Sequence, residues 1–381
     1  MMVRARRLLA VLALVGLASG CSSLNPFASS APKPAELQPF EATAQLQPLW
    51  QARVPGAGDY RFFPAVVGEN VYVAGHDGTV SLLRNGAVIW SVKLDKRLSA
   101  GVGSDGRLAV VVAVDGEVIA LDAQSGQARW RASSGVEVLA PPAVGESTVA
   151  VRASDSRLIG FATADGAQRW TYRRDTPALS LRSVSGMTLD GRVLVLGYPG
   201  GRIAAINIEN GGPLWELTVA VPRGVTELER IADVVGAPSV GARDVCAVSY
   251  QGRIACFDLS NGSTVWARDF SSSTGLDRDT RFALVTDDQD RVHALDVFSG
   301  ASVWVQDALV RRVLTRPLVV GEHVVVGDVE GYVHLLSREQ GRFAARARVD
   351  SSPLNVPPQR LGVNAFVVQS RDGSVQAFEP K

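Results

Sequence analysis

The fold is decided by residues 110–130, which read VVVAVDGEVIALDAQSGQARW. The stretch contains an apolar strand, an Asp-Gly pair, a strand of alternating polarity, a turn that closes on Gly126, and a third strand that carries Trp130. An Asp-Gly pair between apolar runs is a strong hairpin signal, because both central residues of the tight turn must accept a positive φ. The stretch therefore predicts three consecutive antiparallel strands.

This pattern recurs along most of the chain. The first turn has eight copies: Asp77-Gly78, Asp115-Gly116, Asp155-Ser156, Gly200-Gly201, Gln251-Gly252, Gln289-Asp290, Glu330-Gly331 and Asp372-Gly373. The second turn has seven: Gly86, Gly126, Gly166, Gly211, Gly262, Gly300 and Gly341. Four residues after each of these glycines stands a tryptophan, except that the last is followed by Ala345. Successive tryptophans from Trp50 to Trp304 lie 40, 40, 40, 45, 51 and 38 residues apart, and a period near 40 is typical of a four-stranded propeller blade.

The two ends of the repeat region complement each other. The eighth copy ends with the chain, before its tryptophan-bearing strand is made, and residues 49–52, Leu-Trp-Gln-Ala, can supply that strand from the other end. The sequence therefore predicts an all-β fold, a single eight-bladed β-propeller over residues 46–381, with four antiparallel strands per blade and closure by the N- and C-terminal strands. Seven blades and a stray strand are the competing arrangement. In either case the tryptophans are expected to wedge between blades as structural residues.

The N-terminus has the features of an export signal. Arg4, Arg6 and Arg7 precede an apolar stretch over residues 8–17, and small residues stand directly before Cys21. This pattern predicts a secretory signal peptide over residues 1–20, because the apolar stretch is too short to span a bilayer. It resembles a lipobox, with Ala18 in the usual place of Leu, which implies lipidation of Cys21. The alternative is an ordinary cleavage site with an incidental cysteine.

The segment after Cys21 is rich in Ser, Ala, Pro and Gln and has no helical or strand period. We therefore interpret residues 21–45 as the lipidated cysteine and a flexible tether. Ser22 in place of Asp after the cysteine, by resemblance to lipoproteins of Gram-negative bacteria, implies sorting to the outer membrane. The protein is then expected to be lipid-anchored there, facing the periplasm.

Charge and composition narrow the function classes. The chain has 39 basic and 38 acidic residues, and loss of the three signal-peptide arginines changes the net charge from +1 to −2. This balance gives no indication of nucleic-acid binding. A polysaccharide-binding propeller is disfavoured because the tryptophans are used in blade packing.

The repeat Ala-Leu-Asp-x-x-Ser-Gly-x-x-x-Trp at residues 120–130 resembles the tryptophan-docking repeat of pyrroloquinoline quinone (PQQ) dehydrogenases and their non-catalytic relatives. Within that group the chain resembles the BamB family of outer-membrane protein assembly factors, on four further segments: LSLR at 179–182, E-x-x-R-x-x-D at 227–233, GD-x-EGY-x-H at 327–334 and VDSS at 349–352. The resemblance implies a non-catalytic scaffold of the outer-membrane β-barrel assembly (BAM) complex. Such a scaffold docks on the POTRA domains of BamA and assists delivery and insertion of outer-membrane proteins, and direct contact with unfolded clients stays open.

An enzyme is the alternative class, as a PQQ- or other ligand-binding propeller like the quinoprotein dehydrogenases. Such an enzyme needs Ca²⁺ ligands, a carboxylate base and typically an adjacent Cys-Cys pair. No two of the three cysteines are adjacent, and the four histidines fall in separate repeats or turns without an i, i+4 pair. We therefore expect no enzyme activity, no cofactor and no metal.

The partner-binding surface is predicted from the two longest intervals between tryptophans. Both extra lengths lie in connections from the outermost strand of one blade to the innermost strand of the next, after Trp170 and after Trp215. The alternative is that the leucines cap the blades and the charges are solvated. The resemblance assigns both segments to the BamA-facing side, with Val235 departing from an expected Asp. The predicted partner-binding residues are Leu179, Leu181, Arg182, Glu227, Arg230 and Asp233.

The remaining cysteines, Cys246 and Cys256, stand at equal distances from Gln251 and are expected opposite one another on a hairpin. An oxidising compartment permits a cross-strand disulfide. Two buried free thiols are the open alternative.

Overall fold

The structure is a computed structural model that describes residues 33–182, 184 and 186–381. The chain divides into two compact units, Met1–Pro34 and Ala35–Lys381. The predicted signal peptide and Cys21 lie outside the described residues. All regular secondary structure in the described part consists of β-strands, and every strand belongs to the second unit.

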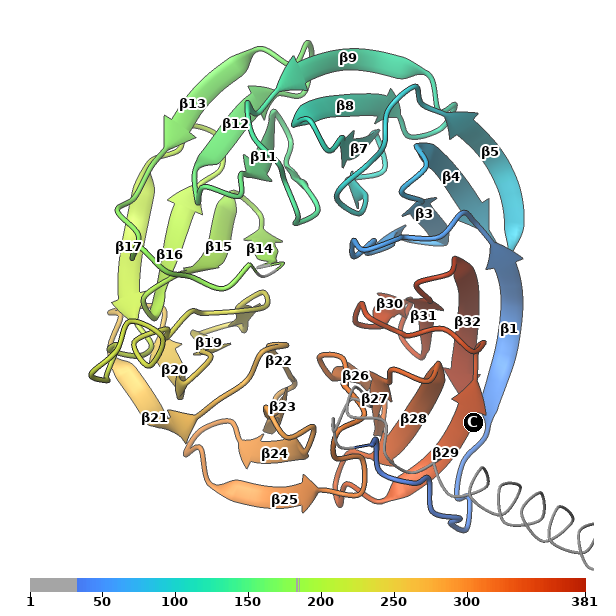
Figure 1. The fold of residues 1–381 in the computed structure, drawn as a ribbon, viewed down its shortest axis with the longest axis vertical. Helices are drawn as coiled ribbons and strands as arrows, with labels where there is room; N and C mark the ends of the chain where they lie inside the picture. Colours follow the sequence, from blue (N-terminus) through green and yellow to red (C-terminus); the bar gives the residue numbers. More distant parts are fainter. Residues whose placement is uncertain (1–32, 183, 185) are drawn as a thin grey trace, which may run out of the picture. The chain divides into compact units, whose positions relative to one another are not determined.

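The second unit is a closed ring of eight sheets, each with four antiparallel strands (Figure 1). We label the strands of a blade A to D, from the centre of the ring outward. Blade one consists of β2 (Ala65–Val67), β3 (Asn70–Ala74), β4 (Thr79–Arg84) and β5 (Ala87–Lys93), and blade two of β6 (Gly103–Ser104), β7 (Leu108–Val112), β8 (Glu117–Asp122) and β9 (Ala128–Ser133). Blade three consists of β10 (Ala143–Val144), β11 (Thr148–Arg152), β12 (Leu158–Ala162) and β13 (Gln168–Tyr172), and blade four of β14 (Met187–Asp190), β15 (Val193–Tyr198), β16 (Arg202–Asn207) and β17 (Pro213–Thr218).

The other half of the ring has the same plan. Blade five consists of β18 (Ser239–Val240), β19 (Asp244–Val248), β20 (Gly252–Asp258) and β21 (Thr264–Phe270), and blade six of β22 (Leu276–Arg278), β23 (Phe282–Thr286), β24 (Val292–Asp296) and β25 (Ser302–Gln306). Blade seven consists of β26 (Leu318–Val320), β27 (His323–Gly327), β28 (Tyr332–Ser337) and β29 (Phe343–Arg348), and blade eight of β30 (Gln359–Leu361), β31 (Ala365–Gln369), β32 (Ser374–Pro380) and β1 (Leu46–Arg53). The predicted eight-bladed propeller is confirmed.

The middle strands of each blade form the core. In blade two, β7 and β8 are buried along nearly their whole length, whereas β9 on the outside is mostly exposed. A strand that is covered on both faces is expected to read as a nearly continuous apolar run, and β7 reads LAVVV. The Asp-Gly turn between them needs glycine, because Gly116 has φ 84° and a Cβ there would lie 2.5 Å from the carbonyl oxygen of Val136.

The D-strand tryptophans join neighbouring blades as predicted. The indole of Trp130 donates a hydrogen bond to the carbonyl oxygen of Thr163 in blade three (2.8 Å), and its ring covers Gly166 so closely that a Cβ there would lie 2.5 Å from it. Corresponding indole hydrogen bonds to the next blade are made by Trp90, Trp170, Trp266 and Trp304. Between blades four and five, Leu217 is the nearest side chain to Gly262.

Closure uses the two ends of the repeat region. Strand β1 pairs antiparallel with β32, with Trp50 opposite Ala377, and the two strands lie side by side in Figure 1. A Cβ on Gly86 in blade one would lie 2.7 Å from the Cβ of Trp50, so Trp50 packs on the turn glycine of blade one as Trp130 packs on that of blade three. The alternative of seven blades with a stray strand is excluded.

The last part of the predicted tether lies against the propeller. The segment 35–45, which the sequence analysis assigned to the tether, packs on blades six and seven. Leu37 joins the apolar cluster between these blades, and the Phe40 ring stacks on Phe343 with centroids 5.2 Å apart. These two apolar side chains are the local reason for the difference, because each removes apolar surface from water on docking.

A buried ionic network holds the start of this segment. Arg312 is 1% exposed, and it donates from Nε to Asp328 and from Nη1 to the carbonyl oxygen of Ala35, both at 2.7 Å. His334 Nε2 lies 2.9 Å from the same carboxylate, and Arg346 Nε donates to His334 Nδ1 at 3.2 Å. Because Nδ1 accepts this bond, the neutral ring carries its proton on Nε2 and donates it to Asp328. Burial lowers the pKa of His334, which favours the neutral form.

Removal of strand β1 is expected to open the ring. Deleting residues 22–52 removes the fourth strand of blade eight, whereas deleting residues 22–34 stops before the packed segment. We expect the longer deletion to lower the melting temperature by about 5 °C or more, since a domain larger than about 250 residues loses roughly 2 °C or less per kcal/mol and a whole strand contributes several kcal/mol. The shorter deletion should melt within about 2 °C of the intact mature chain, and equal melting of both deletions would show that the termini do not hold the ring closed.

Replacement of an inter-blade tryptophan measures the contact directly. Trp130→Ala should lower the free energy of unfolding by about 3–5 kcal/mol, as a buried large-to-small change. Leu214→Ala is the control, because Leu214 is 52% exposed on the outer strand of blade four and its loss should cost below about 0.5 kcal/mol. Denaturant titration of both variants gives the comparison, and similar midpoints would contradict the structural role of Trp130.

Candidate functional site

The two longest D-to-A connections lie on one face of the propeller. The first joins β13 to β14 and the second joins β17 to β18, so they lead into the consecutive blades four and five. In a four-stranded meander, D-to-A and B-to-C connections emerge on one face, while A-to-B and C-to-D turns emerge on the other. This places both long connections together, as the sequence analysis predicted from their spacing.

Asp233 ties the two connections to each other. Its carboxylate accepts a hydrogen bond from the backbone N–H of Leu181 (2.6 Å) in the first connection. It accepts another from Gly200 (3.1 Å), in the B-to-C turn of blade four. Asp233 is only 3% exposed. It was predicted to contact a partner, but both of its oxygens are used inside the chain, so its role in this structure is to position the surface.

Arg182 is exposed but paired. Its guanidinium donates to Glu137 at 2.8 Å, and the hydroxyl of Tyr60 donates to the other oxygen of the same carboxylate at 3.1 Å. The pKa of Arg182 is raised, chiefly by its hydrogen bond to Glu137. The pKa of Tyr60 is raised by burial and then by its bond to Glu137. The contact fixes the direction in which the Arg182 side chain points. The ion pair contributes little to the stability of the fold, because the arginine side chain is 70% exposed.

The second connection contains one compact turn. Thr226 and Glu229 form a reciprocal cap: Glu229 N–H donates to the Thr226 hydroxyl, and the Glu229 carboxylate accepts from the N–H groups of Val225 and Thr226. Arg230 pairs with Glu227 at 3.3 Å and donates to the carbonyl oxygen of Gly224. The charged groups are therefore paired within the turn, whereas the apolar side chains of the turn face water.

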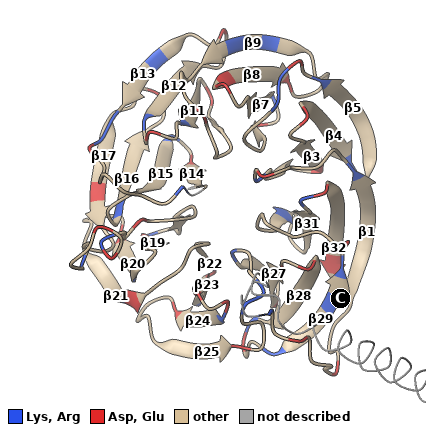
Figure 2. Ribbon diagram, viewed as in Figure 1, with Lys and Arg blue, Asp and Glu red and all other residues tan. Residues whose placement is uncertain are grey.

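Several large apolar side chains are exposed on these connections. Leu179 is 44% exposed on the first, and Val221, Val225 and Leu228 are 64%, 90% and 68% exposed on the second. We define the docking surface as these apolar residues with the charged residues beside them: Leu179, Arg182, Val221, Val225, Glu227, Leu228 and Arg230. Figure 2 shows both basic and acidic residues in the long connection near β17 and β20. Exposed apolar side chains among polar neighbours are typical of protein-binding surfaces.

The predicted partner-binding residues are therefore divided. Leu179, Arg182, Glu227 and Arg230 are exposed on one face, Leu181 is half-buried, and Asp233 is buried. Sequence reasoning missed Val225 and Leu228, although apolar residues in an otherwise polar loop were a signal for them. It also missed Glu137 and Tyr60. The local sequence gives no signal for these two residues, because they come from other blades.

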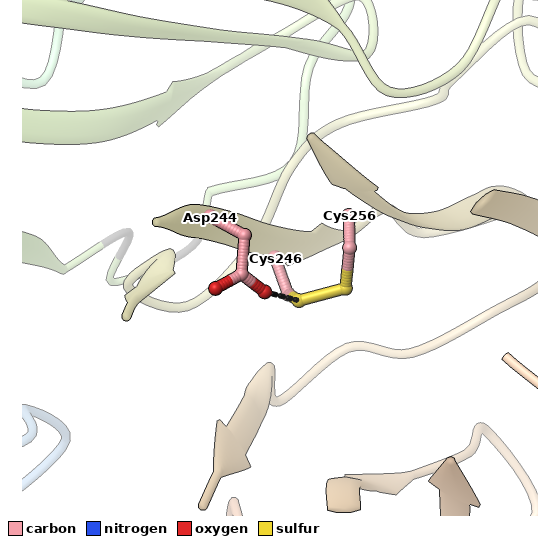
Figure 3. A group of neighbouring side chains, drawn as sticks. All are labelled: Asp244, Cys246 and Cys256. Atoms are coloured by element: carbon pink, nitrogen blue, oxygen red, sulfur yellow. Dashed lines mark hydrogen bonds between the residues drawn. A yellow bond between two sulfur atoms is a disulfide. The ribbon is translucent and has the colours of Figure 1, made fainter. Parts of the chain in front are cut away.

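The two cysteines lie opposite one another on β19 and β20 and are joined by a disulfide, with their Cα atoms 4.1 Å apart (Figure 3). Together with Asp244 they form the one group of potential metal ligands found among the described residues. This group is a poor metal site, since a disulfide sulfur is not a thiolate. The Asp244 carboxylate also pairs with Arg278 at 2.5 Å.

Three of the histidines have partners within the propeller. His76 bonds to the carbonyl oxygen of Leu98, His293 to Asp287 and His334 to Asp328. Each of these contacts is explained by packing, and in the described part of the chain they form no shared cluster with the cysteines. Across the described residues, no helix reaches the length and apolarity of a membrane span.

A family model described as "Outer membrane protein assembly factor BamB" matches residues 76–306. The chain is 44% identical to the outer membrane protein assembly factor BamB of Bordetella pertussis, over 94% of this chain and 92% of that one. The crystal structure of BamB from Moraxella catarrhalis superposes with a TM-score of 0.82 at 28% identity, covering 88% of this chain and all of that one. The quinohemoprotein alcohol dehydrogenase of Comamonas testosteroni has a TM-score of 0.68 at 13% identity, covering 88% of this chain and 76% of that one, which shows a shared fold.

Thiol counting tests the disulfide. The mature body without Cys21, denatured but not reduced, should react with no thiol reagent, and reduction should release two thiols per chain. The expected result follows from the bonded pair on adjacent strands. Two thiols found before reduction would reject the bridge, and a Cys246→Ser variant, which should show one thiol under both conditions, calibrates the assay.

Proposed function

The chain belongs to the outer membrane protein assembly factor BamB family, and from this membership we propose that it is a non-catalytic scaffold of the BAM complex. The observation that carries the proposal is the docking surface, in which apolar side chains are exposed on two connections that Asp233 ties together. A rigid ring that presents such a surface suits binding of another folded protein. The function is then to hold the assembly machinery in position while outer-membrane proteins are delivered and inserted.

The proposed partner is BamA, through its POTRA domains. The family resemblance assigns the LSLR and E-x-x-R-x-x-D segments to that contact. Exposure of Leu179, Arg182, Glu227 and Arg230 on one face supports the assignment. The surface also has what a hot spot needs: apolar anchors that lose water on docking and charged groups at the rim that select orientation. Asp233 contributes indirectly, by fixing the backbone at Leu181.

A quinone-dependent enzyme is less well supported than a scaffold. Its Ca²⁺ ion would need several oxygen ligands in the central cavity. Asp290 supplies the only carboxylate among the described residues of that cavity, and its oxygens accept hydrogen bonds from the backbone of Val313 and Leu314. The chain also has no adjacent cysteines to stack on a quinone. The residues present therefore do not fit the catalytic quinone and its ion.

The proposed location is the periplasmic side of the outer membrane, with Cys21 as the lipid anchor. Ala35 is held at the D-to-A connection before blade seven, through its N–H to Val310 and its carbonyl oxygen to Arg312. The stretch from Cys21 to Ala35 can span at most about 50 Å when fully extended. The lipid would therefore keep this side of the propeller within that distance of the membrane.

The docking surface is tested by a double substitution. Leu179→Ala with Arg182→Ala should weaken binding to the purified POTRA domains at least tenfold and abolish co-purification of BamA, because it removes one apolar anchor and one charge. Melting should be unchanged, since both side chains are exposed. Leu214→Ala with Arg192→Ala is the matched control: both residues are exposed, and both lie near turns of the opposite face.

Two outcomes of that test reject the proposal. Retained binding by the Leu179 and Arg182 double variant would remove this surface as the BamA contact. Loss of binding accompanied by a lowered melting temperature would assign the two residues to folding.

The lipid anchor is tested by Cys21→Ala. The unmodified chain should incorporate labelled palmitate and partition into the detergent phase, whereas the variant should do neither, because acyl chains supply the apolar anchor. Ser23→Ala serves as the control and should behave as the unmodified chain. Palmitate incorporation by the Cys21 variant would place the lipid elsewhere.

A further inference from the structure

A central cavity of about 390 Å³ opens among the connections that lead into the A strands of the blades. Its walls are mainly apolar, with side chains contributed from around the ring: Phe63, Pro142, Val184, Val235, Leu314 and Leu354. The volume is in the range of small-molecule sites. The docking surface does not include these residues, so the cavity is a separate feature of the same face.

Two arginines line this cavity, and among the residues that the structure describes neither has a counter-ion. Arg61 precedes the A strand of blade one and Arg316 precedes that of blade seven. Neither makes an ion pair or a hydrogen bond with any residue that the structure describes. Most other arginines of the described chain are paired, for example Arg182 with Glu137. The cavity therefore carries positive charge that the described residues do not pair.

The two arginines differ in exposure: Arg61 is exposed and Arg316 is half-buried. Burial of part of the Arg61 side chain nevertheless lowers its pKa. The Nε of Arg316 and the hydroxyl of Thr274, both from residues that line the cavity, are buried without a hydrogen-bond partner. Buried polar groups are rarely left in this state, so each needs an explanation. A bound anion would neutralise the guanidinium groups and lower the cost of burying them.

The one carboxylate of the cavity does not balance the arginines. Asp290 accepts backbone hydrogen bonds from Val313 (2.9 Å) and Leu314 (2.8 Å), which fixes both of its oxygens. Burial raises the pKa of Asp290, and the nearby Asp287 and Asp288 raise it further. Its hydrogen bonds hold the connection in place, and a single carboxylate can neutralise only one of the two guanidinium groups.

The topology places the charge on one side of the cavity. The A strands of blades one and seven both contact β30 of blade eight, so the connections that carry Arg61 and Arg316 lie on either side of the one that leads into β30. That connection contributes Asn355 to the lining of the cavity. The connections leading into blades four and five contribute Val184, Met187 and Val235 on the opposite side. The cavity therefore has a cationic side and an apolar side.

We propose that this central cavity binds an organic anion with an apolar body, whose carboxylate lies between Arg61 and Arg316 and whose apolar part contacts the walls toward blades four and five. The carboxylate belongs either to a free organic acid or to the C-terminus of a polypeptide, since both present the same chemistry. Binding needs no metal and no covalent step. It is independent of the docking surface and of its partner.

The experiment compares two fluorescent probes that differ by one anionic group. 8-Anilinonaphthalene-1-sulfonate and N-phenyl-1-naphthylamine have the same aromatic body, but only the first carries a charge. Titrated into the purified mature propeller, the sulfonate should bind at one site per chain and at least tenfold more tightly than the neutral amine. Equal affinity for the two probes, or several weak sites for the sulfonate, would overturn the proposal.

Variants assign the binding to the cavity. Arg61→Gln with Arg316→Gln should weaken binding of the sulfonate at least tenfold and leave binding of the neutral amine and the melting temperature unchanged. Arg223→Gln is the control, because this exposed arginine lies on the same face outside the cavity and its replacement also removes a positive charge. Unchanged sulfonate binding by the double variant, or an equal loss in the control, would reject the site.

Displacement of the sulfonate identifies the source of the carboxylate. Naphthalene-2-carboxylate should displace the probe and naphthalene-2-carboxamide should not. The peptide Ala-Ala-Phe with a free C-terminus is compared with its C-terminal amide, and displacement by the free form alone supports a polypeptide end as ligand. Displacement by the naphthalene acid without either peptide supports a free organic acid, whereas equal displacement by acids and amides contradicts recognition of the charge.

Discussion

The contact between the outer-strand tryptophan of one blade and the turn glycine of the next is the interaction on which the ring depends. The glycine adopts a positive φ, as Gly166 does at 73°, and its missing Cβ leaves room for the indole of Trp130. The indole N–H finds a carbonyl oxygen of the same neighbouring blade, so its burial leaves no polar group without a partner. One residue therefore supplies both packing and a directional bond at the five joints made by Trp90, Trp130, Trp170, Trp266 and Trp304. Because every blade needs a neighbour on both sides, the ring must close, and Trp50 is placed in blade eight to do so.

The same contact between blades limits which parts of the propeller can carry binding residues. The B and C strands are buried and the turns between C and D are used to receive tryptophans, so neither can change much without loss of the ring. The D-to-A connections are under no such restriction. They can be lengthened while the blades on either side keep their contacts, and they form the docking surface and the walls of the central cavity. This is the general arrangement in which a rigid scaffold carries binding residues on its loops.

Three features share that face. The docking surface lies on the connections leading into blades four and five, the central cavity lies at the inner ends of all the connections, and Ala35 is held at the connection leading into blade seven. The buried network around Arg312 fixes Ala35, the first residue of the second unit, at that connection. A lipid on Cys21 would thus hold the propeller from the face that also carries the binding features. The ionic network is well suited to this task, because breaking a buried ion pair leaves an uncompensated charge.

The sequence by itself determined the ring: the Asp-Gly turns, the glycine-to-tryptophan spacing and the incomplete last repeat predicted eight blades and their closure, because each signal is local and recurs with every blade. It also located the two long connections, since extra length shows directly in the tryptophan intervals. Only the tertiary structure decided that Asp233 is buried as a tie between connections, that Arg182 is paired with Glu137, and that Leu37 and Phe40 dock on blades six and seven. These contacts join residues from different blades, and a residue's burial depends on neighbours that are distant in sequence. The meeting of Arg61 and Arg316 in one cavity was likewise decided only by the tertiary structure. The two residues come together because connections from around the whole ring meet there.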